Sequence, residues 1–220
     1  MGSLAQVDKM VITALLRAMV KDNSFAVYVV DIEEELKDLV KQKLGRKLEH
    51  EDYVNYVYDP IDKFEDAVRS GKLPFLYYFE SLDGASENFS TIAVVPLHLT
   101  PERIATMNYV YDLITDGVLT YSDKPDASPE LSVKVAMDAL IRMFLKETLK
   151  FEKIDVGYAV YVLAKYYGLE VKFHRTGCTC NYDEEIFFIV PEVGVYVVYV
   201  YPPKYKQPTI RGRSWHKVFI

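Results

Sequence analysis

The 220-residue chain is poor in several residue types, and each shortage excludes a class of protein. Its two cysteines, Cys178 and Cys180, are too few for a disulfide-bonded scaffold and too close in sequence to pair without strain. Ten glycines and ten prolines exclude collagen-like and low-complexity sequence. No apolar run approaches the roughly 20 residues that cross a bilayer, and the N-terminus shows no signal-peptide pattern. We therefore expect a cytoplasmic globular protein that does not contact membranes.

The residues that are abundant favour a well-packed mixed fold. Half of the chain is hydrophobic, and it holds 18 tyrosines and 11 phenylalanines against one tryptophan. Tyrosine joins a large apolar ring to a hydroxyl, so it suits strand faces and half-buried surfaces. Glu- and Lys-rich stretches such as residues 31–45 are typical of thermophile proteins, so we expect an archaeon or an archaeal virus as the source.

Charge is distributed unevenly along the chain, although the formal net charge is only −6. Residues 1–125 hold 21 acids and 13 bases, a net −8, and residues 126–220 hold 11 acids and 13 bases, a net +2. The only linker-like sequence is 122–130. We predict an acidic, helix-rich lobe over 1–125 and a strand-rich lobe with a basic end over 126–220. One continuous domain is the alternative.

Hydrophobic periodicity and cap residues predict an α+β fold, with a mostly antiparallel sheet and flanking helices. We expect helices over residues 4–21, 32–44, 53–69 with an interruption at Pro60, 100–115, 130–150 and 156–167. Strands are expected over residues 24–30, 73–81, 89–99, 169–175, 185–190, 195–201 and 214–220. The strands over 73–81 and 89–99 should form an antiparallel hairpin.

The last third of the chain carries the residues that suggest chemistry. Glu170-Val171-Lys172, on a predicted strand, resembles the motif of the restriction-endonuclease-like PD-(D/E)XK nuclease superfamily. The order of helix, strand, acidic loop Asp183-Glu184-Glu185 and two further strands is similar to the core of archaeal Holliday-junction resolvases of that superfamily. The third strand, however, reads Val198-Tyr199-Val200 where the family has Glu and Lys.

This resemblance implies a restriction-endonuclease-like fold in the C-terminal half and a Mg²⁺-dependent nuclease. The acids Glu170, Asp183 and Glu185 would hold the Mg²⁺ ion, with Lys172 as their electrostatic partner.

The segment 204–217 predicts nucleic-acid binding independently of that motif. Five cations and an aromatic residue lie in a stretch without an acid: Lys204, Lys206, Arg211, Arg213, Trp215 and Lys217. Cations neutralise phosphate, and aromatic faces stack on bases. The alternative is a solvated loop that Pro202 and Pro203 project outward.

Two other features leave alternatives open. His174, Cys178 and Cys180 have zinc-ligand chemistry, but their spacing favours two small buried thiols over a metal site. The aromatic alternation of the flat, uncharged stretch 195–201 most simply fills two faces of a sheet, and the alternative is an exposed edge or dimer surface. A non-catalytic assembly protein that forms a homo-oligomer such as a homodimer is therefore the alternative to a nuclease.

Overall fold

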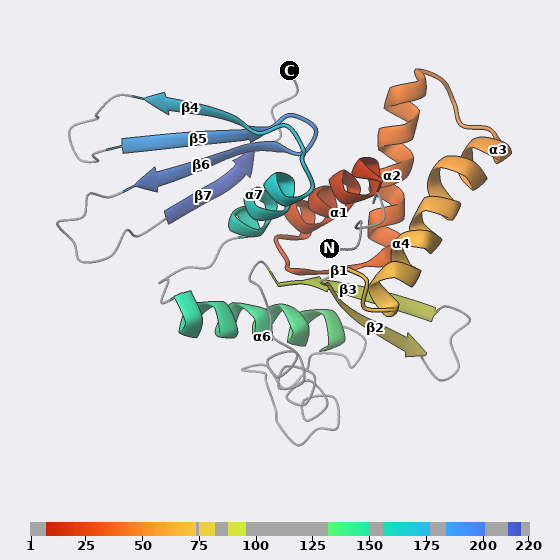
Figure 1. Ribbon diagram of the computed structural model, residues 1–220, viewed down its shortest axis with the longest axis horizontal. Helices are drawn as coiled ribbons and strands as arrows, with labels where there is room; N and C mark the ends of the chain where they lie inside the picture. Colours follow the sequence, from red (N-terminus) through yellow and green to blue (C-terminus); the bar gives the residue numbers. More distant parts are fainter. Residues whose placement is uncertain are drawn as a thin grey trace. The chain divides into compact units, whose positions relative to one another are not determined.

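The computed structural model describes residues 8–73, 75–81, 88–95, 132–149, 156–176, 184–200 and 211–216 (Figure 1). Contacts divide the chain into two compact units, Met1–Met143 and Phe144–Ile220. The division falls within helix α6, Ser132–Leu149, whereas the composition predicts a division near residue 126. Each unit has both helices and antiparallel strands, so the predicted α+β class is confirmed. The predicted helix 100–115 and linker 122–130 lie outside the described residues.

The first unit begins with helix α1, Lys9–Asp22, as the periodicity predicts. Asp8 caps the helix, since its Oδ1 accepts a hydrogen bond from the Met10 backbone N–H at 2.8 Å. The buried face recurs at helical spacing and includes Val11, Ile12, Leu15, Leu16 and Met19. Asn23 ends the helix in the left-handed conformation, which asparagine tolerates better than most residues.

Strand β1, Ala26–Tyr28, is shorter than predicted because helix α2, Val29–Leu44, begins at once. Val29 and Val30 favour strands by propensity, but Val29 lies three residues before Ile32 and extends the apolar face of α2, whereas Val30 is exposed. Gly45 ends α2 with a φ of 64°, as the sequence predicts.

The predicted interruption near Pro60 is a turn of π-helix. Helix α3, His50–Tyr53, passes into the π-helix η1, Val54–Tyr58, and then into α4, Asp59–Arg69. Proline has no N–H to donate, and its ring crowds the carbonyl four residues earlier, here that of Tyr56. That carbonyl lies in the wider π turn, so the chain stays helical on both sides of Pro60.

The sheet of the first unit has the order β1-β3-β2 and is antiparallel throughout. Strands β2, Phe75–Ser81, and β3, Asn88–Val94, form the predicted hairpin. Helix α2 contacts β3, and α4 contacts β2. The tyrosine-rich strand β2 is an outer strand of the described sheet, so pairing of its edge with a second copy stays a prediction.

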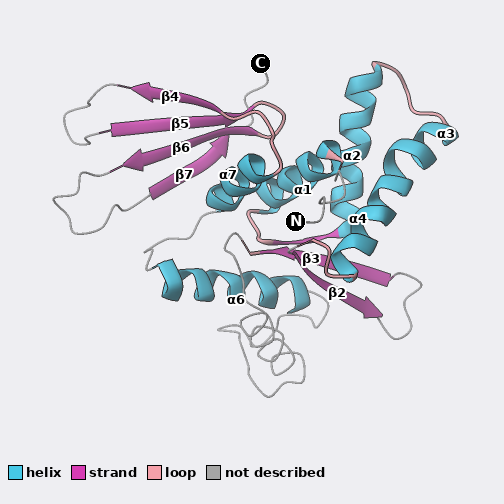
Figure 2. Cartoon of the chain, in the orientation of Figure 1, coloured by secondary structure: helices cyan, strands magenta, loops and turns pink. Residues whose placement is uncertain are grey.

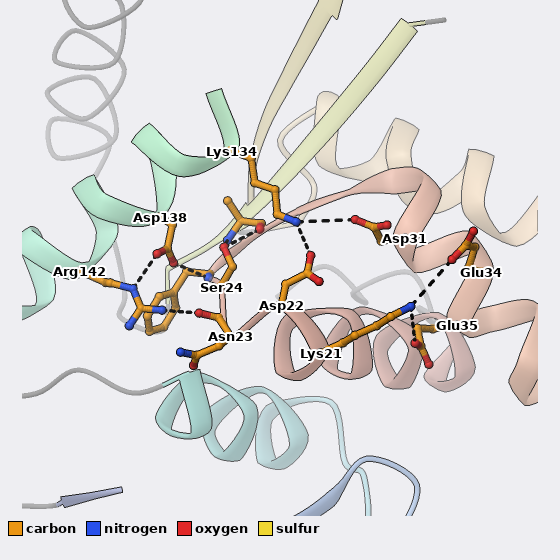
Figure 3. A network of polar contacts seen from close by, with 12 residues as sticks. Lys21, Asp22, Asn23, Ser24, Asp31, Glu34, Glu35, Lys134, Asp138 and Arg142 are labelled. Atoms are coloured by element: carbon orange, nitrogen blue, oxygen red, sulfur yellow. Dashed lines mark hydrogen bonds and ion pairs between the residues drawn. The ribbon is translucent and has the colours of Figure 1, made fainter. Parts of the chain in front are cut away.

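Polar side chains join α6 to the turn that precedes β1 (Figure 3). Asp138 accepts hydrogen bonds from the Phe25 backbone N–H and from Arg142 Nε, both at 2.7 Å. Arg142 also donates to the Asn23 carbonyl. Lys134 of α6 pairs with Asp22 and Asp31, and burial raises the pKa of Asp31 although Lys134 opposes the shift. This network holds the N-terminal half of α6 against the turn.

The second unit contains α7, Val156–Tyr166, and a four-stranded antiparallel sheet of order β4-β5-β6-β7 (Figure 2). The strands are β4, Lys172–Thr176; β5, Glu184–Val190; β6, Gly194–Val200; and β7, Arg211–His216. Helix α7 contacts β5, and Gly168 follows the helix with a φ of 67°.

The sheet corrects one expectation about assembly. Strand β6 contains nearly all of the stretch 195–201, and it pairs with β5 on one side and β7 on the other. The alternative of an exposed edge is therefore wrong for this stretch, because β7 covers the edge of β6 that β5 leaves free.

Burial of Tyr167, directly after α7, raises the pKa of its hydroxyl to about 12. Tyrosine in the unfolded chain ionises near pH 10, so the stability contributed by the neutral hydroxyl is complete below about pH 10 and is lost as the pH rises through about 12. The difference in the free energy of unfolding between wild type and Tyr167→Phe should therefore depend on pH. From pH 9 to pH 12, wild type should lose about 1 to 2 kcal/mol more than the variant does, after allowance for the partial exposure of the side chain. Urea titrations of both proteins at several pH values measure this difference, and a value independent of pH would contradict the prediction.

In the part of the chain that the structure describes, none of the helices has the length and apolar character needed to cross a membrane.

Candidate nucleic-acid interface

The register of β4 to β7 aligns residues in three rows across one face of the sheet. Direct partners in an antiparallel pair lie on the same face, and successive residues alternate between faces. One row is Lys172, Ile189, Val195 and His216; the next is His174, Phe187, Val197 and Arg213; the third is Thr176, Glu185, Tyr199 and Arg211. We call these positions the basic face.

The two faces of the sheet differ in composition. The positions between the rows are mainly apolar, with Arg175 and Glu184 as the charged exceptions. The apolar and aromatic ones are Phe173, Ile186, Phe188, Val190, Tyr196, Val198 and Val200. Val190 of this second set is only 1% exposed. On the basic face, by contrast, the side chain of Lys172 is 60% exposed. At this end of the sheet, the buried valine and the exposed lysine indicate that the apolar set faces the core of the unit and that the basic face meets solvent.

Cations occupy both outer strands of the basic face. Lys172 lies on β4, Arg211 and Arg213 lie on β7, and Glu185 is the only carboxylate residue in the three rows. The central strands contribute aromatic positions, Phe187 on β5 and Tyr199 on β6. Neighbouring strands are about 4.8 Å apart, so β4 and β7 are separated by about 14 Å. The central strands of this face are therefore mainly apolar and aromatic, apart from Glu185, and its outer strands carry the cations.

The structure brings Glu170 and Lys172 together but leaves Glu185 apart from them. Lys172 Nζ lies 3.4 Å from Glu170 Oε1, and both side chains are largely exposed. Glu170 precedes β4, which begins at Lys172, so the predicted strand starts later than expected. Glu185 pairs with Thr176 at the other end of β4, four residues or about 13 Å from Lys172. Asp183 lies outside the described residues.

The basic C-terminal segment is partly a strand. Arg211 and Arg213 belong to β7, so the view of the whole segment as a projecting loop is wrong for this stretch. The register shifts between Val195 and Val197, and Trp215 falls at this irregularity, where pairing assigns it to neither face. The remaining cations of the segment lie outside the described residues: Lys204, Lys206 and Lys217.

Metal ligands do not gather in the described part of the chain, where no three His, Cys, Asp or Glu residues form a group that would hold an ion. His174 is a residue of β4, and Cys178 and Cys180 of the predicted zinc pattern lie outside the described residues.

A second basic surface lies at the C-terminal end of α2, beside an open depression of about 520 Å³. It is lined by Asp38, Lys41, Gln42, Gly45, Arg46 and Lys47. Arg46 donates to both carboxylate oxygens of Asp52, at 2.6 and 2.9 Å, and this bond, with a further one from the Glu49 N–H, holds the pKa of Asp52 below its ordinary value. Because the carbonyl groups at the C-terminal end of a helix repel anions, we treat this surface as a control and not as the site.

A polar cluster in the first unit has a structural role. Glu65 of α4 accepts hydrogen bonds from Tyr77 Oη at 2.5 Å, from Ser90 Oγ at 2.8 Å and from Arg69 at 3.2 Å. Tyr77 lies on β2 and Ser90 on β3, so one carboxylate ties the helix to both strands of the hairpin. Hydrogen bonds to a charged group are among the stronger ones, and this arrangement fixes α4 on the sheet.

Sequence reasoning identified the cations of the basic face but missed the rows in which they lie. Phe187, Tyr199 and His216 were not expected to share a face with Arg211 and Arg213. One local signal for the register of β5 and β6 was available in the sequence. The short turn 191–193 joins the two strands and sets their register, and Gly194, which follows the turn, has a φ of 149°.

No protein-family model matches the chain, and the comparisons with curated proteins and with solved structures also find no significant match.

Proposed function

We propose that this protein binds nucleic acid through the basic face of its second unit. The observation that carries the proposal is the strand register, which aligns Lys172, Arg211 and Arg213 on one face of a single sheet. Phosphate binding needs several cations on a common surface, because each one neutralises a phosphate and releases a counterion. Residues far apart in sequence are here brought onto such a surface by backbone pairing alone.

The charge of the second unit supports the same proposal. Residues 144–220 hold 11 bases and 8 acids, a net +3, whereas residues 1–143 hold 15 bases and 24 acids, a net −9. A polyanion is therefore attracted by the second unit and repelled by the first. The expected result is binding confined to a small surface, not a coat of nucleic acid around the whole protein.

Binding without cleavage is the activity that we expect of the basic face. The register separates Glu185 from Lys172 and Glu170 by a distance that one Mg²⁺ ion, with ligands near 2.1 Å, does not bridge. The restriction-endonuclease-like fold stays a prediction, supported by the order of helix α7 and the antiparallel strands β4 to β6. Incubation of DNA and RNA with Mg²⁺ or Mn²⁺, against EDTA, tests for cleavage, and metal-dependent products would revive the nuclease.

The binding proposal is tested with the triple variant Lys172→Ala, Arg211→Ala, Arg213→Ala. Trp215, the one tryptophan of the chain, lies on β7, so its fluorescence, excited at 295 nm, reports binding. The fluorescence anisotropy of labelled oligonucleotides gives the affinity. We expect the triple variant to bind about 100-fold more weakly in about 0.1 M salt. The slope of log K against log salt should decrease by about 2 for a single strand, because three phosphate contacts are lost.

The matched control removes three exposed lysines, two from the last turn of α2 and one from the segment that follows it, with Lys41→Ala, Lys43→Ala and Lys47→Ala. Both triple variants lose three charges, so a difference between them reflects position and not net charge. Affinity within about twofold of wild type is expected for the control. Equal loss in the two variants, or no loss in the first, would overturn the proposal.

A further inference from the structure

We infer that the basic face takes single-stranded nucleic acid, whose bases stack at the positions of Phe187 and Tyr199. This inference rests on the proposed function and adds the class of ligand. It depends on where the register places the two aromatic residues relative to the cations, and not on the number of charges.

The aromatic positions lie in the middle of the basic face on neighbouring strands. Phe187 of β5 pairs with Val197 of β6, and Tyr199 is two residues further along β6 on the same face. Such diagonal neighbours are about 7 Å apart, within reach of successive bases of an extended strand. The line that joins the two positions runs obliquely, so a ligand that covers both passes from β5 to β6.

Each aromatic position has a polar or cationic partner beside it in its row. Tyr199 has two direct cross-strand partners, Arg211 on β7 and Glu185 on β5, and His174 is a direct partner of Phe187. Arg213 lies in the row of Phe187, one strand beyond Val197. A base over either aromatic position therefore has a group that binds phosphate or donates a hydrogen bond close to it.

A sheet face with aromatic positions on its central strands favours a single strand over a duplex. In a duplex the faces of the bases are covered by their neighbours, and an element that enters the groove is needed to read them. A single strand exposes base faces, which stack on aromatic rings, while its phosphates meet cations at the edges of the platform. The aromatic positions of the basic face can therefore stack on the bases of a single strand, but they cannot stack on the bases of an intact duplex.

The test compares one 12-nucleotide sequence as a single strand and as a duplex, each as DNA and as RNA, by anisotropy. In Phe187→Leu and Tyr199→Leu the affinity for the single strand should fall by about 5- to 150-fold, the range expected for the loss of one stacked base. Affinity for the duplex and the salt slope should stay unchanged, because no cation is removed. The DNA and RNA arms show which of the two sugars the face prefers.

Three controls separate stacking from damage to the fold. Tyr199→Phe keeps the ring and should bind within about twofold of wild type. Tyr166→Leu removes an exposed aromatic residue of α7 and should have no effect on binding. Thermal melts followed by circular dichroism establish that each variant is folded.

The possible results distinguish the inference from the proposal beneath it. Leucine variants that bind the single strand as wild type does, or that weaken single strand and duplex equally, overturn the inference while the charge-based proposal stands. A wild-type protein that binds none of the four nucleic acids overturns both.

Discussion

Replacement of Phe25 by alanine is expected to lower the free energy of unfolding by about 3 to 5 kcal/mol. Phe25 is fully buried and is one of the largest side chains with no exposure. Its backbone is held on both sides, since its N–H donates to Asp138 and its carbonyl accepts from the Val94 N–H at 2.8 Å. The surrounding side chains are therefore poorly able to collapse into the space, and the cavity adds to the lost transfer free energy.

Urea unfolding measures this loss, with two substitutions as controls. Phe25→Leu leaves a smaller cavity and should cost clearly less. Tyr56→Ala removes a ring that is about half exposed, so its effect should stay within about 0.5 kcal/mol. A loss below about 1 kcal/mol for Phe25→Ala would show that the turn before β1 is not part of the core.

Removal of the Asp138 carboxylate is expected to have the second largest effect, about 2 to 3 kcal/mol for Asp138→Ala. The substitution removes two short charge-assisted hydrogen bonds and leaves the Phe25 N–H without its acceptor. Asp138→Asn retains one carbonyl oxygen and should cost less. The exposed Asp66, which is 4.0 Å from Arg69, is the control, since Asp66→Ala loses only a surface ion pair.

A double-mutant cycle with Arg142→Ala divides the Asp138 effect between its two partners. If Asp138 acts mainly through the Phe25 N–H, the coupling energy with Arg142 should be about 1 kcal/mol, well below the total. A coupling energy equal to the whole loss would contradict the role of the backbone bond.

The elements of the fold were largely predictable because their signals are local. The periodicity of α1, the left-handed Gly45 after α2 and the hairpin of β2 and β3 are each encoded within a few neighbouring residues. The bond between Phe25 and Asp138 carries no such signal, since the two residues are 113 positions apart.

The candidate site was predicted in part, for the same reason. Composition alone identifies Arg211 and Arg213, but their common face with Tyr199 depends on the register of β6 and β7. A shift of one residue would move both arginines to the other face. The irregularity between Val195 and Val197 is such a shift, and local sequence does not reveal it.

The long separation between Phe25 and Asp138 has a consequence for the order of folding during synthesis. In the second unit, each described strand of the sheet pairs with the next one in sequence, so these contacts close short loops and form early once that part is made. In the first unit, the turn between α1 and β1 is held by α6, which is synthesised more than a hundred residues later. Until α6 leaves the ribosome, the buried ring of Phe25 and its N–H lack this support, and that turn is where the nascent chain most needs protection from aggregation.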